Sequence, residues 1–164
     1  LLGAKLQPML LQCGVNLRPE NVRAFALGNE QGNDLLRRFA ARGGKILAYQ
    51  GWADQSVLPL NLVDYYETVE RTMGGSAPTR DFFRLFMVPG MGHCQGGPGT
   101  DQFDKIGLIR AWVEEGKAPD MVLAEHRTNG VADRRRPLCP HPQAAKYKGS
   151  GSTDDAANFS CAKP

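Results

Sequence analysis

FFRLFMVPGMGHCQGGPG, residues 82–99, is the stretch of sequence that decides the fold. Its first seven residues, 82–88, are apolar apart from Arg84 and predict a strand. The glycine-rich loop that follows carries His93, and a histidine at the end of a strand is well placed for proton transfer. In an α/β sheet, reactive groups gather at the carboxyl ends of strands, where loops converge. The stretch therefore predicts an α/β sheet with a functional histidine at that edge.

A second strand-like run, residues 45–50, lies upstream and is mostly apolar, as expected for a sheet that is covered on both faces. It ends in Gly51-Trp52-Ala53-Asp54. Between the two runs, residues 59–73 predict an amphipathic helix because apolar residues recur there at helical spacing. The order strand, helix, strand predicts a parallel pair of strands joined by a right-handed crossover.

Asp54 and His93 match the late half of a Ser…Asp…His order, each on the loop after a strand. The acid would accept a hydrogen bond from one imidazole nitrogen, so that the other nitrogen can take a proton from a serine. Singly, the aspartate is typical of a turn and the histidine of a structural residue, but together they point to catalysis. No serine completes the order. Gly149-Ser150-Gly151 resembles a nucleophile elbow, but we expect it neither to follow a strand nor to open a helix, and it comes after the histidine.

The rest of the chain gives weaker patterns. The helix expected next after the histidine loop would be capped by Thr100 or Asp101. From Thr128 onward the chain is expected to be irregular. The other predicted elements are short helices over 19–27 and 35–40, a longer helix over 103–115 and a short edge strand over 121–124.

The 164 residues are 41% hydrophobic and 23% charged, which is ordinary for a globular protein with one real core. The formal charge of +3 is slight. Because Arg134-Arg135-Arg136 lacks interleaved aromatic residues, a solvated loop is favoured over a nucleic-acid site. No run of about 18 apolar residues predicts a membrane span. The chain begins with Leu1 and not with Met, so we expect a processed chain or a piece of a longer protein.

Four cysteines allow three pairings within the chain. Cys139 and Cys161 flank a tail that is poor in apolar residues and needs a covalent link to stay ordered. A bridge that closes such a loop contributes about 3 kcal/mol, and it would place the protein in an oxidising compartment. Four free thiols in a cytosolic protein are the alternative. No Cys-x-x-Cys motif and no metal-like spacing of histidine and cysteine occurs, so no zinc site is expected.

Long segments of the chain resemble the tannase and feruloyl esterase family. Residues 43–54 resemble its acid-bearing segment, residues 88–99 resemble its histidine segment, and residues 136–143 with 147–151 look like its C-terminal tail. The resemblance covers about residues 43–161. It implies a secreted or periplasmic serine hydrolase with the α/β-hydrolase fold, of which this chain would hold only the C-terminal portion.

By position in the family pattern, Asp54 would be the triad acid and His93 the general base. Cys94 would be unpaired within this chain and would bridge to a cysteine outside it, directly before the nucleophilic serine. That serine, the oxyanion-hole donors and most of a lid domain that carries calcium would lie in a missing N-terminal half. Residues 1–33 would be the remnant of the lid, and residues 34–164 the C-terminal part of the catalytic domain.

The function that the resemblance implies is hydrolysis of small aromatic, phenolic acid-type esters, with no cofactor in this chain and no nucleic-acid or membrane partner. Cys13 receives no role, and the chain alone is expected to be inactive. A non-catalytic binding module derived from a hydrolase is the alternative, and an upstream Gly-Cys-Ser-x-Gly-Gly elbow would decide for the enzyme. A thiol enzyme that uses Cys94 with His93 is disfavoured, because adjacent residues do not easily align for proton transfer.

Overall fold

The computed structural model describes the backbone of residues 30–164 and the side chains from residue 34 onward. The predicted helix 19–27 and nearly all of the predicted lid remnant lie outside the described residues. The described part of the chain forms two compact units, a smaller one made of residues 30–44 and 64–82 and a larger one made of residues 45–63 and 83–164.

The smaller unit is helical. It contains α3 (Glu30–Ala41), most of α4 (Pro59–Met73) and α5 (Ser76–Arg80). The side chain of Arg37 on α3 donates a hydrogen bond to the carbonyl of Thr72 near the end of α4 (3.2 Å). The predicted helix over 59–73 is confirmed, with Tyr65, Tyr66 and Val69 on its buried side. The helix predicted over 35–40 is present and begins earlier, at Glu30.

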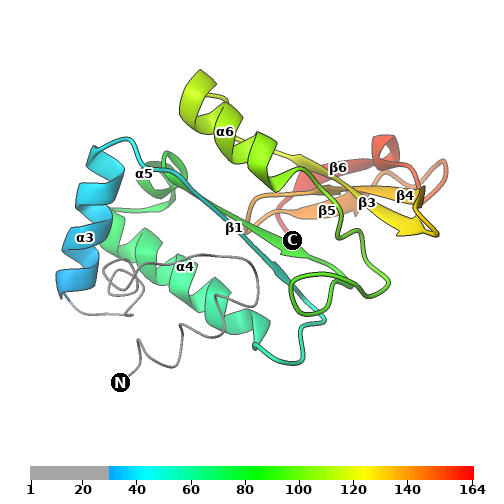
Figure 1. Ribbon diagram of the computed structural model, residues 1–164, viewed down its shortest axis with the longest axis horizontal. Coiled ribbons are helices and arrows are strands. Elements are labelled where there is room, and N and C mark those ends of the chain that lie inside the picture. Colours follow the sequence, from blue (N-terminus) through cyan, green and yellow to red (C-terminus); the bar gives the residue numbers. More distant parts are fainter. Residues whose placement is uncertain (1–29) are drawn as a thin grey trace. The chain divides into compact units, whose positions relative to one another are not determined.

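The larger unit contains the predicted parallel strands. β1 (Ile46–Gly51) and β2 (Phe83–Val88) lie side by side, with Gly51 opposite Val88 (Figure 1). All six residues of β2 are buried, so an apolar run is required there, since neither face of the strand meets water. The one charged member, Arg84, forms an ion pair with Asp120 (3.2 Å) and lies over the ring of Trp112.

α6 (Lys105–Glu115) begins one residue after Asp104, whose carboxylate accepts a hydrogen bond from the backbone N–H of Gly107 (2.8 Å). The prediction that Thr100 or Asp101 caps this helix is therefore wrong. Both residues are buried ahead of the helix. A cap must stand directly before the first helical turn to reach its free N–H groups, and only Asp104 stands there.

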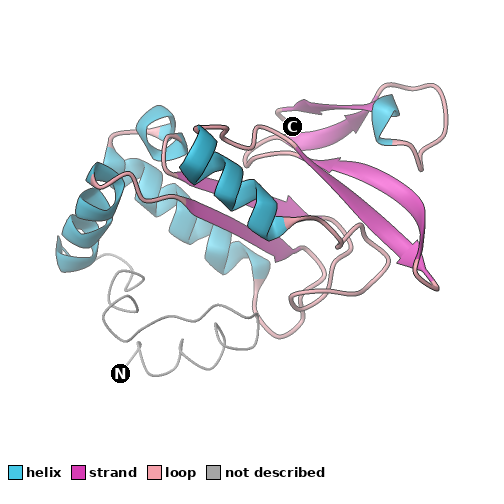
Figure 2. Ribbon diagram, turned by 45° about the horizontal axis from the view of Figure 1, so that its top comes forward, coloured by secondary structure: helices cyan, strands magenta, loops and turns pink. Residues whose placement is uncertain are grey.

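The expectation of an irregular tail is wrong. β3 (Val122–Thr128) and β4 (Val131–Leu138) form a long antiparallel hairpin (Figure 2). Asn129 and Gly130 turn the chain with positive φ angles of 51° and 81°, the conformation for which Asn-Gly is favoured in two-residue turns. The predicted edge strand 121–124 is the beginning of β3, and the arginine run lies on β4 and not in a loop.

A second, shorter hairpin completes the tail. β5 (Ala144–Tyr147) pairs antiparallel with β6 (Phe159–Ala162), and the 3-10 turn η2 (Ala156–Asn158) precedes β6. The predicted disulfide between Cys139 and Cys161 is present and joins the end of the long hairpin to β6. The chain after β4 also pairs with β2, where the backbone N–H of His141 donates to the carbonyl of Leu85 (2.8 Å).

The core of this unit joins β2 to the long hairpin. Its fully buried side chains come from β2, from the loop after it, and from β3 and β4. They are Phe86, Val88, Met91, Val122, Ala124 and Leu138. Because Met91 belongs to this cluster, the start of the histidine loop is fixed by the same packing that fixes the strands.

Candidate active site

Backbone hydrogen bonds continue between the two loops after β1 and β2 have ended. The N–H of Trp52 donates to the carbonyl of Val88 (2.9 Å), and the N–H of Ala53 donates to that of Met91 (3.0 Å). Gly51 lies against the Met91 carbonyl so closely that a Cβ atom would have no room. The strand register thus carries the two loops alongside each other past the edge of the sheet.

Both carboxylate oxygens of Asp54 are occupied. Oδ1 accepts hydrogen bonds from the backbone N–H groups of Ser56 (2.8 Å) and Val57 (2.9 Å). Oδ2 lies 3.0 Å from Nδ1 of His93 and accepts a longer bond from the Gln50 amide (3.4 Å). The side chain is only 3% exposed. Burial on its own would raise the pKa of Asp54, but the bonds from Val57, His93 and Ser56 together hold this pKa below its ordinary value.

The predicted pair of Asp54 and His93 is therefore formed in space. Because Asp54 offers only acceptor oxygens, its contact assigns a proton to Nδ1 of His93. The opposite nitrogen, Nε2, is buried and has no hydrogen-bond partner among the described residues. An imidazole oriented by a carboxylate on one side, with an unsatisfied acceptor on the other, has the geometry of a general base.

The histidine loop closes on itself around His93. The N–H of Gly92 donates to the carbonyl of Gly96 (2.9 Å), and the N–H of Gly96 donates to Oδ2 of Asp101 (2.6 Å). Asp101 is 6% exposed. Sequence reasoning assigned Asp101 to a helix cap and missed this contact. The better-placed cap, Asp104, was a signal that Asp101 serves another purpose.

Cys94 is disulfide-bonded in the structure. The expectation that Cys94 is unpaired within this chain, with its partner outside it, is wrong. That expectation took the partner from family position, whereas a disulfide requires only that two sulfur atoms meet with suitable geometry. The partner of Cys94 lies outside the described residues. A bonded sulfur offers no thiolate, so the alternative of a thiol enzyme using Cys94 is also wrong.

Ser150 lies in the loop between β5 and η2, three residues after the end of β5. The expectation that this serine follows no strand is thus wrong, but it opens no α-helix, which an elbow requires. Within the described residues, no group of three or more His, Cys, Asp or Glu side chains is placed to hold a metal ion. The same part of the chain contains no helix long and apolar enough to cross a membrane.

An acid and a histidine on adjacent loops, at the carboxyl ends of parallel strands, are the arrangement expected of an α/β-hydrolase. The comparisons with known proteins agree. The chain belongs to the tannase and feruloyl esterase family, whose sequence pattern matches residues 28–162. The fold class predicted from the sequence and the family resemblance are both confirmed.

Individual relatives match most of the chain. The chain is 52% identical over 132 residues to mono(2-hydroxyethyl) terephthalate hydrolase of Piscinibacter sakaiensis, which covers 79% of this chain and 21% of that protein. It is 41% identical over 157 residues to an uncharacterized esterase of Xanthomonas campestris. That match covers 77% of this chain and 27% of the esterase. The crystal structure of feruloyl esterase B from Aspergillus oryzae matches with a TM-score of 0.73 and 30% identity, covering 77% of this chain and 28% of that one. The chain thus spans less than a third of the length of these relatives.

Proposed function

We propose that this chain supplies the acid and the base of a carboxylic ester hydrolase that works by a Ser-His-Asp triad. The observation that carries the proposal is the 3.0 Å contact between Asp54 Oδ2 and His93 Nδ1, together with the buried Nε2 that no described residue satisfies. Family membership supports the reaction class. The relatives named above are esterases and hydrolases.

Each residue has a defined role in the reaction. Nε2 of His93 takes the proton of a serine hydroxyl as that oxygen attacks the ester carbonyl, and it then returns the proton to the leaving alcohol. Asp54 stabilises the imidazolium that forms between these steps. Hydrogen bonds keep the pKa of Asp54 below its ordinary value, so the carboxylate stays ionised throughout. The acyl-enzyme is hydrolysed by water through the same two transfers.

The nucleophilic serine is proposed to lie upstream of Leu1 in the same protein. Residues 1–33 contain no serine, and no described serine hydrogen-bonds to His93 Nε2. The relatives are several times longer than the matched region and provide a place for such a residue. On this proposal residues 34–164 are the C-terminal part of the catalytic domain, and the N-terminal half of the protein is their necessary partner.

The proposed substrate is a small ester of an aromatic acid, because two relatives are named for terephthalate and ferulate esters. The proposed location is the periplasm or the cell exterior. The disulfide between Cys139 and Cys161 and the disulfide at Cys94 support it, since such bonds persist in oxidising compartments.

The test uses the full-length protein and replaces His93 by alanine. Turnover of methyl ferulate, methyl gallate and a p-nitrophenyl ester should fall by on the order of 10⁴-fold or more, because triad members act as a unit. His126→Ala is the matched control, since His126 is also bound to an aspartate, Asp133, but on the β3–β4 hairpin. His126→Ala should lower kcat far less than His93→Ala, because it removes no group that reacts.

Two results would overturn the proposed function. A fully active His93→Ala enzyme would mean that the base is elsewhere. A full-length protein with no elbow upstream and no turnover of any of these esters would favour the binding module. This chain by itself should be inactive in the same assays, because the lost oxyanion donors alone account for roughly 3–4 kcal/mol of transition-state stabilisation.

A further inference from the structure

We propose that Asp101 and Arg134 are positioning residues, which hold the histidine loop, residues 90–99, in the geometry that proton transfer by His93 requires. The proposal rests on the function proposed above. Neither side chain forms a hydrogen bond or an ion pair with His93. Each holds a different point of the loop, and the two side chains come from different parts of the larger unit.

Asp101 holds the loop through a carboxylate buried behind it. Its Oδ2 accepts hydrogen bonds from the backbone N–H of Gly96 (2.6 Å) and from the amide of Gln102 (2.9 Å). Gly96 in turn accepts the N–H of Gly92 (2.9 Å), the residue directly before His93. Two hydrogen bonds thus separate Asp101 from the backbone of the base. Hydrogen bonds to an ionised acceptor are roughly twice as strong as neutral ones.

The position of Asp101 is itself fixed by the long hairpin. Its neighbour Gln102 exchanges two backbone hydrogen bonds with Glu125 on β3, at 3.0 and 2.8 Å. This isolated bridge is antiparallel and ties the segment after the loop to the strand. Through these hydrogen bonds, Asp101 connects Gly96 to β3. A shift of the hairpin would therefore move the loop.

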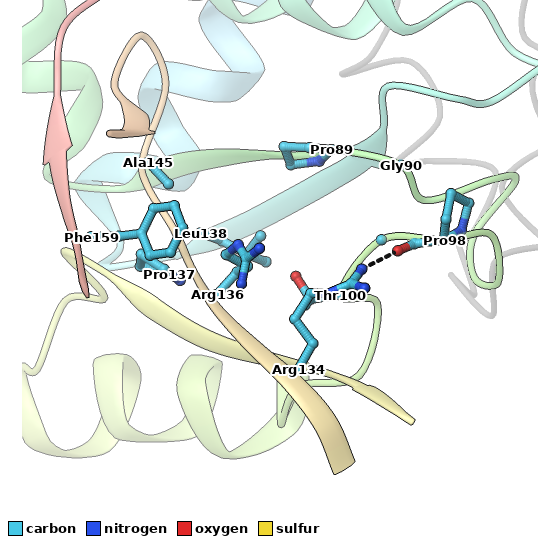
Figure 3. Close-up of a pocket in the computed structure, with 11 residues that line it drawn as sticks. Pro89, Gly90, Pro98, Thr100, Arg134, Arg136, Pro137, Leu138, Ala145 and Phe159 are labelled. Atoms are coloured by element: carbon cyan, nitrogen blue, oxygen red, sulfur yellow. Dashed lines mark hydrogen bonds between the residues drawn. The ribbon is translucent and has the colours of Figure 1, made fainter. Parts of the chain in front are cut away.

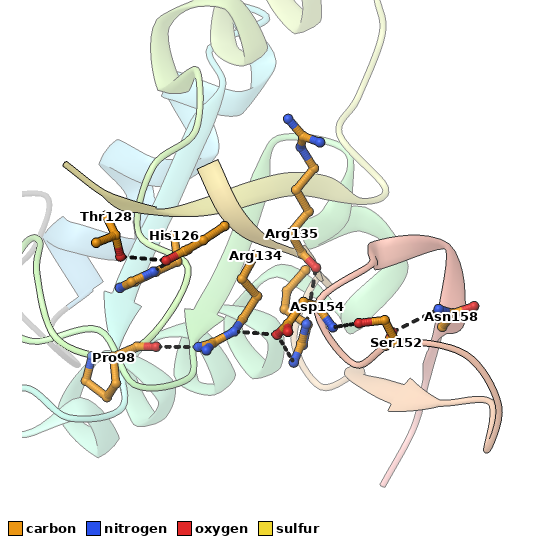
Figure 4. Close-up of polar contacts among 10 residues, drawn as sticks. Pro98, His126, Thr128, Arg134, Arg135, Ser152, Asp154 and Asn158 are labelled. Carbon is orange, nitrogen blue, oxygen red and sulfur yellow. Dashed lines mark hydrogen bonds and ion pairs between the residues drawn. The ribbon is translucent and has the colours of Figure 1, made fainter. Parts of the chain in front are cut away.

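Arg134 holds the loop at a second point. Its Nη1 donates to the carbonyl of Pro98 (2.9 Å), while its Nε donates to Oδ1 of Asp154 (2.9 Å), as Figure 4 shows. The backbone carbonyl of Asp154 also accepts the N–H of Arg135 (2.8 Å). The guanidinium thus lies between the loop and the segment before η2, with one donor directed to each.

These polar contacts matter because one side of the loop is not packed against other described residues. A cavity of about 390 Å³ lies there, lined by Pro89, Gly90, Pro98 and Thr100 on the side of the loop and by residues of β4, β5 and β6 on the other (Figure 3). The hydrogen bond from Arg134 to Pro98 lies at this cavity. Where side chains do not interdigitate, packing resists displacement less, so the hydrogen bonds contribute more to the position of this part of the loop.

The predicted consequence is a loss of rate and not of substrate binding. A misplacement of about 1 Å in a catalytic group can lower the rate by about 10²-fold. Asp101 and Arg134 act on the base and have no described contact with a substrate site. Removing either side chain should therefore lower kcat and leave KM nearly unchanged, which is the pattern of an interaction made only in the transition state.

The experiment measures kcat and KM of Asp101→Ala, Asp101→Asn and Arg134→Gln in the full-length protein. A serine-reactive phosphonate counts the competent active sites, so that kcat refers to folded enzyme. Asp101→Ala should lose about 10- to 100-fold in kcat per site. The kcat of Asp101→Asn should lie between those of Asp101→Ala and the wild type. The amide oxygen still accepts a hydrogen bond from the N–H of Gly96 but carries no charge.

Matched controls separate positioning from general stability. Asp104→Ala removes a carboxylate that also accepts a backbone N–H, but at the start of α6. Arg110→Gln removes a guanidinium paired with Glu114 on the same helix. Both controls should keep the wild-type kcat per site, whatever they do to Tm.

Several outcomes would overturn the proposal. If Asp101→Asn and Arg134→Gln both keep the wild-type kcat per site while His93→Ala is inactive, the positioning role is wrong and the proposed function stands. If KM rises while kcat stays unchanged, these residues serve binding and not the base. Should Asp101→Ala fail to fold, Asp101→Asn and Arg134→Gln decide. An active His93→Ala would refute the proposed function itself.

Discussion

β2 and β4 belong to the same unit but are stabilised in opposite ways. Every residue of β2 is buried, whereas β4 alternates between exposed and half-buried residues until its last two. On β4 the arginines form ion pairs with Asp154 and Glu125, and Arg136 lies over the ring of Phe159. The comparison teaches that the base follows a strand held by apolar packing along its whole length. Only the buried end of β4 packs in that way, and the rest of the strand is held by polar contacts and a tight turn.

The largest expected effect is on packing within β2. Leu85→Ala removes a side chain with 0% exposure and should lower the free energy of unfolding by about 3 kcal/mol, from lost burial and the cavity left behind. Leu123→Ala, on the outer hairpin with 50% exposure, should cost less than about 1 kcal/mol. Urea denaturation measures both. Equal losses would break the comparison.

Removing the disulfide of the tail comes next. Replacing both Cys139 and Cys161 by serine opens the loop that the bridge closes, with a sequence separation of 22, and should lower the free energy of unfolding by about 3 kcal/mol, the chain-entropy value for a loop of this size. The double variant avoids reductant, which would also open the disulfide at Cys94. An unchanged urea midpoint would show that polar contacts alone hold the tail.

Acid should affect the β1 loop through Asp54. Its pKa in the folded protein lies below the ordinary value of 3.8, because hydrogen bonds outweigh burial. The stabilisation is therefore complete above the unfolded-state pKa and is lost as the pH falls through the folded-state value. Asp54→Asn lacks this titration, so its stability should fall less steeply on acidification below about pH 5. Parallel pH curves for the two proteins would contradict the assignment.

The smallest effect is expected at the exposed end of β4. Val131→Thr changes a side chain that is 70% exposed and should shift the free energy of unfolding by less than about 0.5 kcal/mol. Val88→Thr makes the same change at 0% exposure and buries a hydroxyl, which costs about 1–3 kcal/mol without a partner. Thermal and urea denaturation distinguish them. A sensitive Val131 would mean that the hairpin end is covered in the whole protein.

The sequence predicted the part of the fold that depends on burial. β1, β2 and α4 lie where apolar periodicity placed them, and the pairing of Asp54 with His93 followed from strand order. β4 was not predicted because charged residues interrupt its hydrophobic pattern. Its backbone pairing with a neighbouring strand cannot be recognised from such a sequence. The Asn129-Gly130 turn was a usable signal, since this dipeptide is the strongest short-range sign of a hairpin.

The candidate site was only partly predictable for a similar reason. Asp54 and His93 stand at strand ends, which periodicity locates. Asp101 binds the backbone of Gly96, and no side-chain pattern outside helix caps and turns reveals such a contact with a backbone N–H. Cys94 was misassigned because family position gave its partner, although the bond depends on which sulfur atoms meet in space.

The parallel register between β1 and β2 has a consequence for how such sequences vary in length. The acid and base face each other because Gly51 stands opposite Val88, and the contacts that orient the Asp54 carboxylate end at Val57 and resume at His93. We expect insertions or deletions in the intervening crossover, residues 58–82, to leave both ends of this arrangement intact. The number of residues between acid and base should therefore be able to vary among related proteins, while the distance between their side chains should not.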